Sequence, residues 1–188
     1  MRLPWRTAGV AASAVAASAV PALGEALWLP STGAGPWTVW TCHLVHHGAT
    51  HLLWDLGAFV VLGGVLERLD PRALTASLAL GATGVGVAMA ATMPDDAVYG
   101  GLSGVASALY VSLAVQLGRR DRWLGLGMLG LFVAKLASEL CTGQVLFAEG
   151  GSVVHVPVAH LVGALCGLGT LALSGRMGGR NEQGLRQR

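Results

Sequence analysis

A serine between glycines and a distant histidine could together supply a nucleophile and its base. Ser103 lies in the segment Tyr99-Gly-Gly-Leu-Ser-Gly104, and His160 lies in Ala159-His-Leu-Val-Gly-Ala-Leu-Cys-Gly167. A hydroxyl becomes a strong nucleophile when an imidazole within hydrogen-bond reach takes its proton. These residues predict a Ser103–His160 dyad that attacks a carbonyl group, with no third acidic residue assigned to orient the histidine.

Attack on a carbonyl also requires donors for the oxyanion that forms. The amide of Ser103 is expected at a helix start, where backbone N–H groups are unpaired. His51 and Asp55 are four residues apart and share one helix face. We expect the Ser103 amide and His51 to be the donors, with a structural role as the alternative for His51, while Gly101 and Gly104 allow close approach of backbones. Asp55 either tunes His51 or caps a polar network, and it is either protonated by burial or committed to His51 or another donor.

Four histidines are concentrated in residues 41–51, the segment that ends at His51. They are His43, His46, His47 and His51. We expect His46 to brace a loop and His43 and His47 to lie at the aqueous interface. A zinc site is an alternative, although no matching Cys or Glu ligand accompanies the cluster. The cysteines form no CxxC pair, so free thiols are expected, and the sequence predicts neither a metal nor a cofactor.

The elements that position these residues must lie in lipid. Of the 188 residues, 53% are hydrophobic and only 12% are charged, and the mean hydropathy is +0.60. A soluble domain of this length would carry about 25% charged residues. The composition therefore predicts a membrane protein, and its net charge of +2 is too small to indicate nucleic-acid binding.

Six apolar stretches predict an all-α bundle of six membrane-spanning helices in one domain, residues 1–188, because a span takes roughly 20 apolar residues. Pro21 is expected to kink the first span; a cleaved signal peptide is the alternative reading of that segment. The predicted spans are about Thr7–Leu29, Ala49–Leu66, Ala73–Met93, Gly101–Leu117, Trp123–Cys141 and Val153–Ser174.

The basic residues alternate with these spans. Every Lys and Arg except Lys135 precedes the first span or follows the second, fourth or sixth, and residues 175–188 form a basic tail. The positive-inside rule then predicts that both termini are cytoplasmic. Ser103, His51 and His160 fall in the outer half of the membrane, with His160 roughly 10 Å into its span.

Lys135 and Glu139 are four residues apart in the fifth predicted span, so we expect them to pair on the bundle side. Intramembrane charges of this kind are functional candidates. A role in gating is an open alternative to a structural pair. A small proton or ion transporter is a rival reading of the whole chain, supported mainly by Lys135, since most polar groups lie in the outer half.

Four motifs in order resemble the rhomboid family of intramembrane serine proteases. Residues 101–104 resemble the GxSG that carries the family's nucleophile, and residues 159–167 resemble its AHxxGxxxG. His46, His51 and Asp55 resemble HxxxxHxxxN, and residues 62–68 resemble GGxxE[KR]. The resemblance extends from residue 37 to residue 173. It implies a six-helix protease of membrane-anchored proteins, and an inactive client-binding relative is the other possibility within the family.

Three departures narrow the resemblance. Asp55 stands where most rhomboids have Asn, Ser107 replaces a frequent aromatic residue, and Trp37-Thr38 lacks the arginine of a common Trp-Arg pair. The short chain, the Trp54-Asp55 pair and the absent arginine together resemble the rhombosortase branch of the family. That branch implies a bacterial inner-membrane enzyme open to the periplasm. Its substrates would be single-pass proteins with a C-terminal Gly-Gly motif, helix and basic cluster, and its other partner is membrane lipid.

Overall fold

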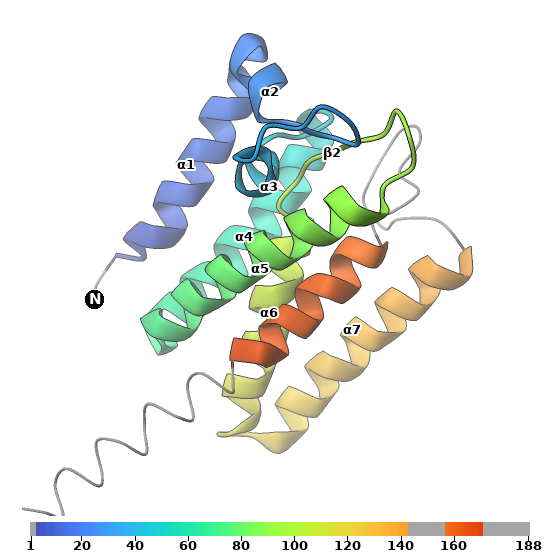
Figure 1. The fold of residues 1–188 in the computed structure, drawn as a ribbon. Coiled ribbons are helices and arrows are strands. Elements are labelled where there is room, and N and C mark those ends of the chain that lie inside the picture. Colours follow the sequence, from blue (N-terminus) through green and yellow to red (C-terminus); the bar gives the residue numbers. More distant parts are fainter. Residues whose placement is uncertain (1–2, 143–156, 171–188) are drawn as a thin grey trace, which may run out of the picture.

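The computed structural model describes residues 3–142 and 157–170, which are mostly helical (Figure 1). The long helices are α1 (Trp5–Ala19), α4 (Ala49–Leu69), α5 (Pro71–Thr92), α6 (Ser103–Gly118), α7 (Arg122–Thr142) and a last helix, Pro157–Thr170. The short elements are α2 (Pro21–Leu27), β1 (Leu29–Pro30), α3 (Thr38–Thr41), the 3₁₀ helix η1 (Cys42–Leu44) and β2 (Val98–Tyr99).

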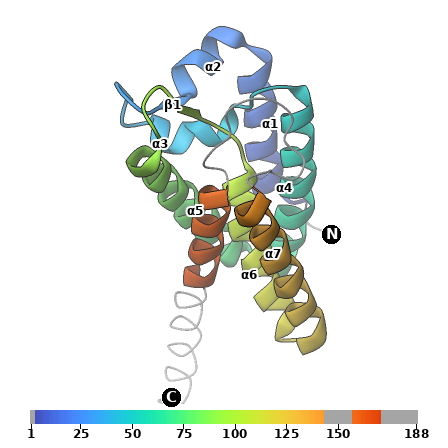
Figure 2. The ribbon, with the colours of Figure 1, turned by 90° about the vertical axis from the view of Figure 1, so that its right-hand side faces the viewer.

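Helix α6 lies at the centre of the bundle, in contact with α4, α5 and α7. The last helix packs on α6 in the space between α5 and α7 (Figures 1 and 2). Glycine makes this packing close, since a Cβ on Gly163 would overlap the carbonyl oxygen of Gly104. Likewise, a Cβ on Gly167 would overlap the carbonyl oxygen of Ala108. Small residues at these contacts are typical of helices packed in lipid.

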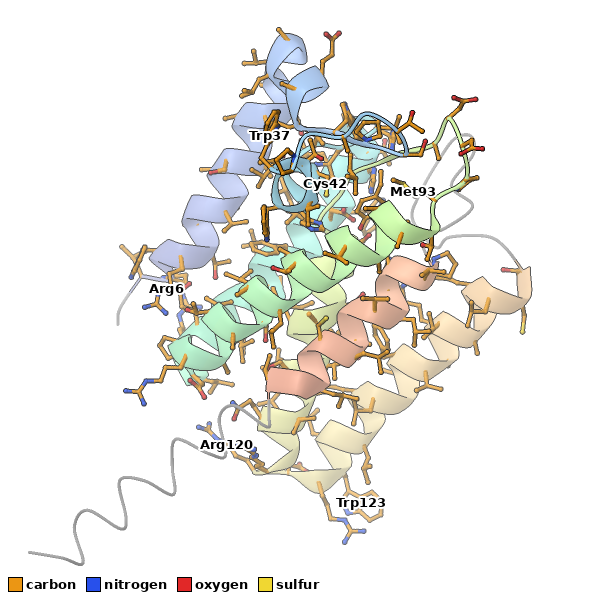
Figure 3. All side chains as sticks on the ribbon, viewed as in Figure 1. Arg6, Trp37, Cys42, Met93, Arg120 and Trp123 are labelled. Atoms are coloured by element: carbon orange, nitrogen blue, oxygen red, sulfur yellow. The ribbon has the colours of Figure 1, made fainter. Side chains whose placement is uncertain are left out.

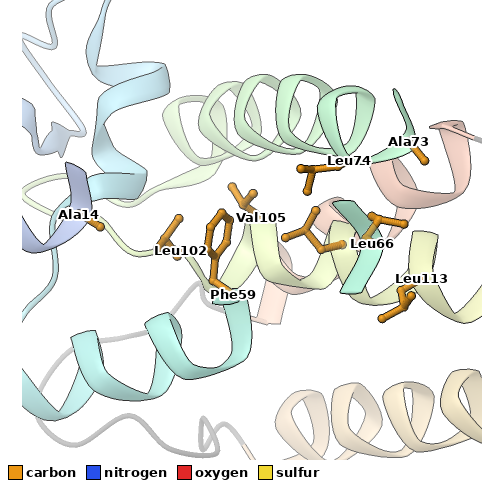
Figure 4. Close-up of a cluster of buried hydrophobic side chains, with 9 residues drawn as sticks. Ala14, Phe59, Leu66, Ala73, Leu74, Leu102, Val105 and Leu113 are labelled. Carbon is orange, nitrogen blue, oxygen red and sulfur yellow. The ribbon is translucent and has the colours of Figure 1, made fainter. Parts of the chain in front are cut away.

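The apolar core joins the first helices to α6. Phe59 and Leu66 of α4 pack against Leu102, just before α6, and against Val105 and other residues of α6 (Figure 4). Leu74 of α5 and Ala14 of α1 complete the same cluster. Because α6 is surrounded by other helices, its residues 104–109 are all buried, and its first residue is held at a fixed place in the bundle.

A tight turn links α4 to α5 at Asp70. Its Oδ1 accepts hydrogen bonds from the amides of Arg72 and Ala73 at 3.0 Å, which caps α5. Pro71 occupies the first position of α5, where its missing N–H has no cost. The other carboxylate oxygen accepts from Gln116 of α6 at 3.1 Å, so this turn also anchors the end of α6.

The predicted first span, 7–29, is wrong as a single helix. The chain breaks at Val20, whose φ of −117° and ψ of 99° are extended, and α2 restarts at Pro21. Proline disfavours the helical conformation in the residue before it and lacks the N–H that would continue the helix. The break is therefore larger than the expected kink.

The other expected spans correspond to helices. The second to fifth match α4, α5, α6 and α7 within a few residues, while the sixth contains Pro157–Thr170 and has both ends outside the described residues. Of the described helices, α4, α5 and α7 are long and apolar enough to cross a membrane by length and composition. Helix α6 and the last helix are apolar and shorter.

A short strand pair, unforeseen in an all-α prediction, ties the loop after α2 to the segment before α6. Leu29 pairs with Tyr99 and Pro30 with Val98 in antiparallel register. The pairing continues in a bond from the Ser31 amide to the Ala97 carbonyl at 2.9 Å. It helps to hold the residues that lead into Ser103.

The arginines of the described chain gather at one end of the helices, whereas Lys135 lies within α7 beside His160. Arg6 donates to the Pro71 carbonyl and to Thr75, both at 2.8 Å, so the start of α1 lies beside the α4–α5 turn. Figure 3 shows Arg6 and Arg120 toward one end of the bundle and Trp37 and Met93 toward the other. The basic tail, residues 175–188, lies outside the described residues.

Candidate active site

Ser103 is the first residue of α6 and is partly exposed. Leu102 occupies the N-cap position, and its apolar side chain cannot accept hydrogen bonds from the free amides of the first turn. Asp55 of α4 supplies the missing acceptor, with its Oδ2 3.0 Å from the Ser103 amide nitrogen. A carboxylate at a helix start also interacts favourably with the helix dipole. Asp55 thus fixes the backbone of Ser103.

Two histidines contact the same carboxylate oxygen. The Nε2 atoms of His46 and His51 each lie 3.3 Å from Asp55 Oδ2, and the two rings meet edge to face with centroids 5.1 Å apart. The Nδ1 of His46 lies 3.5 Å from the Ser18 hydroxyl. The Nε2 atom of His46 also lies 3.4 Å from the Leu102 amide, which donates toward it. Both residues therefore belong to the polar network around Ser103.

Glycine is required next to this network. Gly101 has φ of +129°, a conformation that L side chains rarely adopt. A Cβ there would lie 3.0 Å from Asp55 Oδ2 and 3.0 Å from the ring of His51. A Cβ on Gly104 would lie 2.9 Å from Val85 and 3.2 Å from the Ala159 carbonyl oxygen. Gly101 therefore lies against side chains of α4, and Gly104 lies against the backbone carbonyl of Ala159.

His160 reaches the site from the last helix. Ala159 lies against Gly104, so the residues next to Ser103 and His160 in sequence are in contact across the two helices. His160 is buried, with 3% of its surface exposed. Among the described residues, no hydrogen bond joins the Ser103 hydroxyl to His160; such bonds are often long in a resting enzyme and shorten when substrate binds.

Glu139 contacts His160, a meeting of two helices that local spacing does not predict. The expected ion pair within α7 is present, with Lys135 Nζ 2.7 Å from Glu139 Oε1. The other carboxylate oxygen, Oε2, lies 2.7 Å from Nδ1 of His160. Sequence spacing revealed the Lys–Glu pair but could not show which residue of another helix it would meet.

His43 was expected at the aqueous interface, and that expectation is wrong. Only 2% of its surface is exposed, because the loop containing α3 and η1 packs down on α5. Its Nε2 lies 2.9 Å from the Ala82 carbonyl oxygen and its Nδ1 lies 3.3 Å from that of Gly101. Burial lowers the pKa of His43, so a neutral ring braces the backbone just before Ser103.

Tyr99 is a further buried polar residue beside the site. Among the described residues its hydroxyl has no hydrogen-bond partner, and a Cβ on Gly104 would lie 3.2 Å from it. His47 is exposed, and its ring is parallel to that of His51 at 6.1 Å. His155 and most of the loop at residues 142–152 lie outside the described residues. Within the described ranges, no three His, Cys, Asp or Glu side chains are grouped as metal ligands.

The apolar helices indicate a multi-pass membrane protein. Within them, the partly exposed Ser103 and the buried His160 form part of a polar site. A protein-family model described as Rhomboid domain matches residues 33–176. The chain therefore belongs to the rhomboid family, whose members are generally intramembrane serine proteases. A search of curated proteins finds no match to the chain.

Proposed function

We propose that this protein is an intramembrane serine endopeptidase in which Ser103 is the nucleophile and His160 the general base. The observation that carries the proposal is the close contact of α6 with the last helix at Gly104 and Ala159. It brings together the start of α6, where Ser103 is partly exposed, and the buried imidazole one residue after Ala159.

The reaction follows the usual course of acyl transfer. His160 takes the proton from the Ser103 hydroxyl as its oxygen attacks the scissile carbonyl, and then returns that proton to the leaving amine. The acyl group stays on Ser103 until a water molecule, deprotonated by the same imidazole, releases it. The Ser103 amide and His51 stabilise the oxyanion at each of the two attacks.

The carboxylate of Asp55 competes with the oxyanion for the two proposed donors. Its carboxylate oxygen already contacts both proposed donors, at 3.0 Å for the Ser103 amide and 3.3 Å for His51. An ionised oxygen in that place would repel an oxyanion. We infer that Asp55 holds the donors in position at rest and that its carboxylate is displaced or protonated when a substrate carbonyl binds.

The resemblance to rhombosortase supports a more specific role. We propose that the enzyme lies in a bacterial inner membrane, with both termini in the cytoplasm, and cleaves near the periplasmic face. Its substrates would be single-pass proteins with a C-terminal tail of Gly-Gly motif, helix and basic cluster. The described arginines lie toward the end of the bundle opposite Trp37 and Met93, which supports this orientation.

A fluorophosphonate probe tests the nucleophile directly. We expect the purified protein to be labelled, Ser103→Ala to abolish labelling, and His160→Ala to reduce it at least about 1000-fold. Ser112→Ala is the matched control, because Ser112 is a buried serine of the same helix that bonds Thr170 at 3.2 Å. Labelling of Ser103→Ala at the wild-type rate would contradict the assignment.

Co-expression tests the substrate class. A reporter ending in a Gly-Gly motif, an apolar helix and an arginine cluster should be cleaved by the wild type and left intact by Ser103→Ala. The same reporter without its Gly-Gly motif is the control for specificity. A client-binding relative would bind the reporter without cutting it. If Ser103 reacts with the probe but the reporter stays uncut, the substrate proposal is contradicted and the assignment of the nucleophile is not.

A further inference from the structure

A buried polar cluster joins α7 to the last helix behind the proposed base. Glu139 is fully buried, with both carboxylate oxygens engaged: Oε1 lies 2.7 Å from Lys135 Nζ and Oε2 lies 2.7 Å from His160 Nδ1. The Lys135 nitrogen is also 3.1 Å from His160 Nδ1. Just along the same helices, Phe132 packs with Ala164. The contact therefore belongs to a packed interface between the two helices.

The geometry decides which ring nitrogen of His160 carries the proton. An ammonium can only donate, and an ionised carboxylate can only accept. A bare Nδ1 would place its lone pair 2.7 Å from the Glu139 carboxylate, which is repulsive, whereas a protonated Nδ1 donates a short bond. Lys135 is satisfied without Nδ1, because it donates to the other oxygen of Glu139. The proton therefore lies on Nδ1.

This proton position is the one that general-base catalysis requires. In a neutral imidazole with its proton on Nδ1, the lone pair is on Nε2, the nitrogen turned away from Glu139. That lone pair can take the proton of a serine hydroxyl. Once it does, the ring becomes an imidazolium, and the adjacent carboxylate stabilises the new charge.

Lys135 maintains the carboxylate in the charged form that this role needs. A carboxylate buried in an apolar bundle is unfavourable unless it is paired. Lys135 is one helical turn away and partly exposed, at 31% for its side chain, so its ammonium can reach the surface of the bundle while it pairs with Glu139. The pair has no net charge before the reaction.

We propose that Glu139 is the positioning residue of a Ser103–His160–Glu139 triad, set on α7 and kept ionised by Lys135. This inference rests on the proposed function, since it concerns the base of the same reaction. The sequence motifs contain no acidic member for His160, and a residue one helix away supplies it.

Glu139→Gln tests the role with little change of shape. A glutamine amide can donate to Nδ1 and so favour the tautomer whose Nε2 carries the proton and cannot act as a base. We expect the maximal rate of fluorophosphonate labelling to fall about 10- to 10⁴-fold. The half-saturating probe concentration should not change, because Glu139 is fully buried. Ser112→Ala, which removes another buried polar contact to the same last helix, should label at the wild-type rate.

A measurement on the wild-type protein covers the case in which Glu139→Gln fails to fold. In detergent micelles with ¹⁵N-labelled histidine, the signals lost in His160→Gln identify His160. We expect a neutral ring protonated on Nδ1, with its N–H proton shifted far downfield by the short bond. A ring protonated on Nε2 would overturn the proposal.

The outcomes separate this inference from the proposed function. A folded Glu139→Gln protein that labels at the wild-type rate overturns the role of Glu139 while Ser103→Ala remains unlabelled. If instead Ser103→Ala still labels, the protease assignment fails. The position of the ring proton on His160 then still shows whether Glu139 accepts a hydrogen bond from Nδ1. A loss of maximal rate together with a proton on Nδ1 supports the triad.

Discussion

Two buried carboxylates reach the candidate site, and each contacts a different part of the proposed machinery. Asp55 accepts the Ser103 amide at 3.0 Å, beside the nucleophile. Glu139 meets Nδ1 of His160 at 2.7 Å, beside the base. A charge near the oxyanion opposes the reaction, whereas a charge behind the imidazole assists it. Removal of the Glu139 charge should therefore slow the reaction far more than removal of the Asp55 charge.

Asp55→Asn should leave fluorophosphonate labelling within about tenfold of the wild type, because an asparagine oxygen can still accept the Ser103 amide. Loss of a single oxyanion donor costs about 100- to 1000-fold in comparable enzymes, and this change removes none. The rate of probe labelling is the measurement.

Asp55→Leu is the control for that substitution. Leucine is similar in size and has no acceptor, so the first amide of α6 would lose its partner. We expect this variant to label much more slowly than Asp55→Asn. Complete loss of labelling in Asp55→Asn itself would show that the charge of Asp55 is needed.

At the scale of elements, the position of the last helix on α6 depends on glycine. Gly163 and Gly167 face backbone carbonyl oxygens of α6, so any side chain there would separate the two helices. Ser103 and His160 come from these two helices, and small displacements of reacting groups lower rates strongly. The small residues of the AHxxGxxxG segment thus set the distance between nucleophile and base.

Gly163→Ala should lower both stability and labelling. Its Cβ would overlap the Gly104 carbonyl oxygen and lie 3.2 Å from Ser107. Overpacking of this kind costs about 1–3 kcal/mol. Thermal unfolding in detergent and the labelling rate are the two measurements.

Gly169→Ala is the matched control on the same helix. Its Cβ would meet only Leu80, at an ordinary 3.9 Å. We expect unfolding and labelling close to the wild type, since alanine also favours the helix. Equal behaviour of the two alanine variants would contradict the proposed role of the Gly104–Gly163 contact.

At the scale of the molecule, polar groups lie at both ends of an apolar bundle. They cap and dock helices at one end and form the candidate site at the other. At the end that carries Arg6, Glu67 accepts the amides of Arg6 and Thr7 at 3.0 and 2.9 Å and the Thr7 hydroxyl at 2.7 Å. That carboxylate caps α1 and docks it on α4. The opposite end carries the loop elements and the strand pair that surround Ser103.

Fusions to alkaline phosphatase, which is active only outside the cytoplasm, test the proposed orientation. A fusion after Asp96, between α5 and β2, should be active. A fusion after Arg120, in the turn between α6 and α7, should be inactive, because arginine-rich turns remain in the cytoplasm. The reverse pattern would place the site on the cytoplasmic side.

Much of the architecture could be predicted from local patterns. Apolar length located α4, α5, α6 and α7 within a few residues, because every backbone polar group in lipid must be satisfied within its own helix. Pro21 indicates an irregularity in the first apolar stretch, but the helix ends there and does not merely kink. A proline can kink or end a helix depending on what packs around it, and the sequence does not describe that packing.

The amino-acid sequence alone determined the composition, the apolar segments and the spacing that named Ser103, His160, His51 and Asp55 as candidates, because these depend on local chemistry and periodicity. The burial of His43, the capping of the Ser103 helix by Asp55 and the contact of Glu139 with His160 became visible in the folded chain. A residue pattern defines which face of a helix is polar. Which faces meet is decided by the packing of whole helices, and that depends on contacts between segments far apart in the chain.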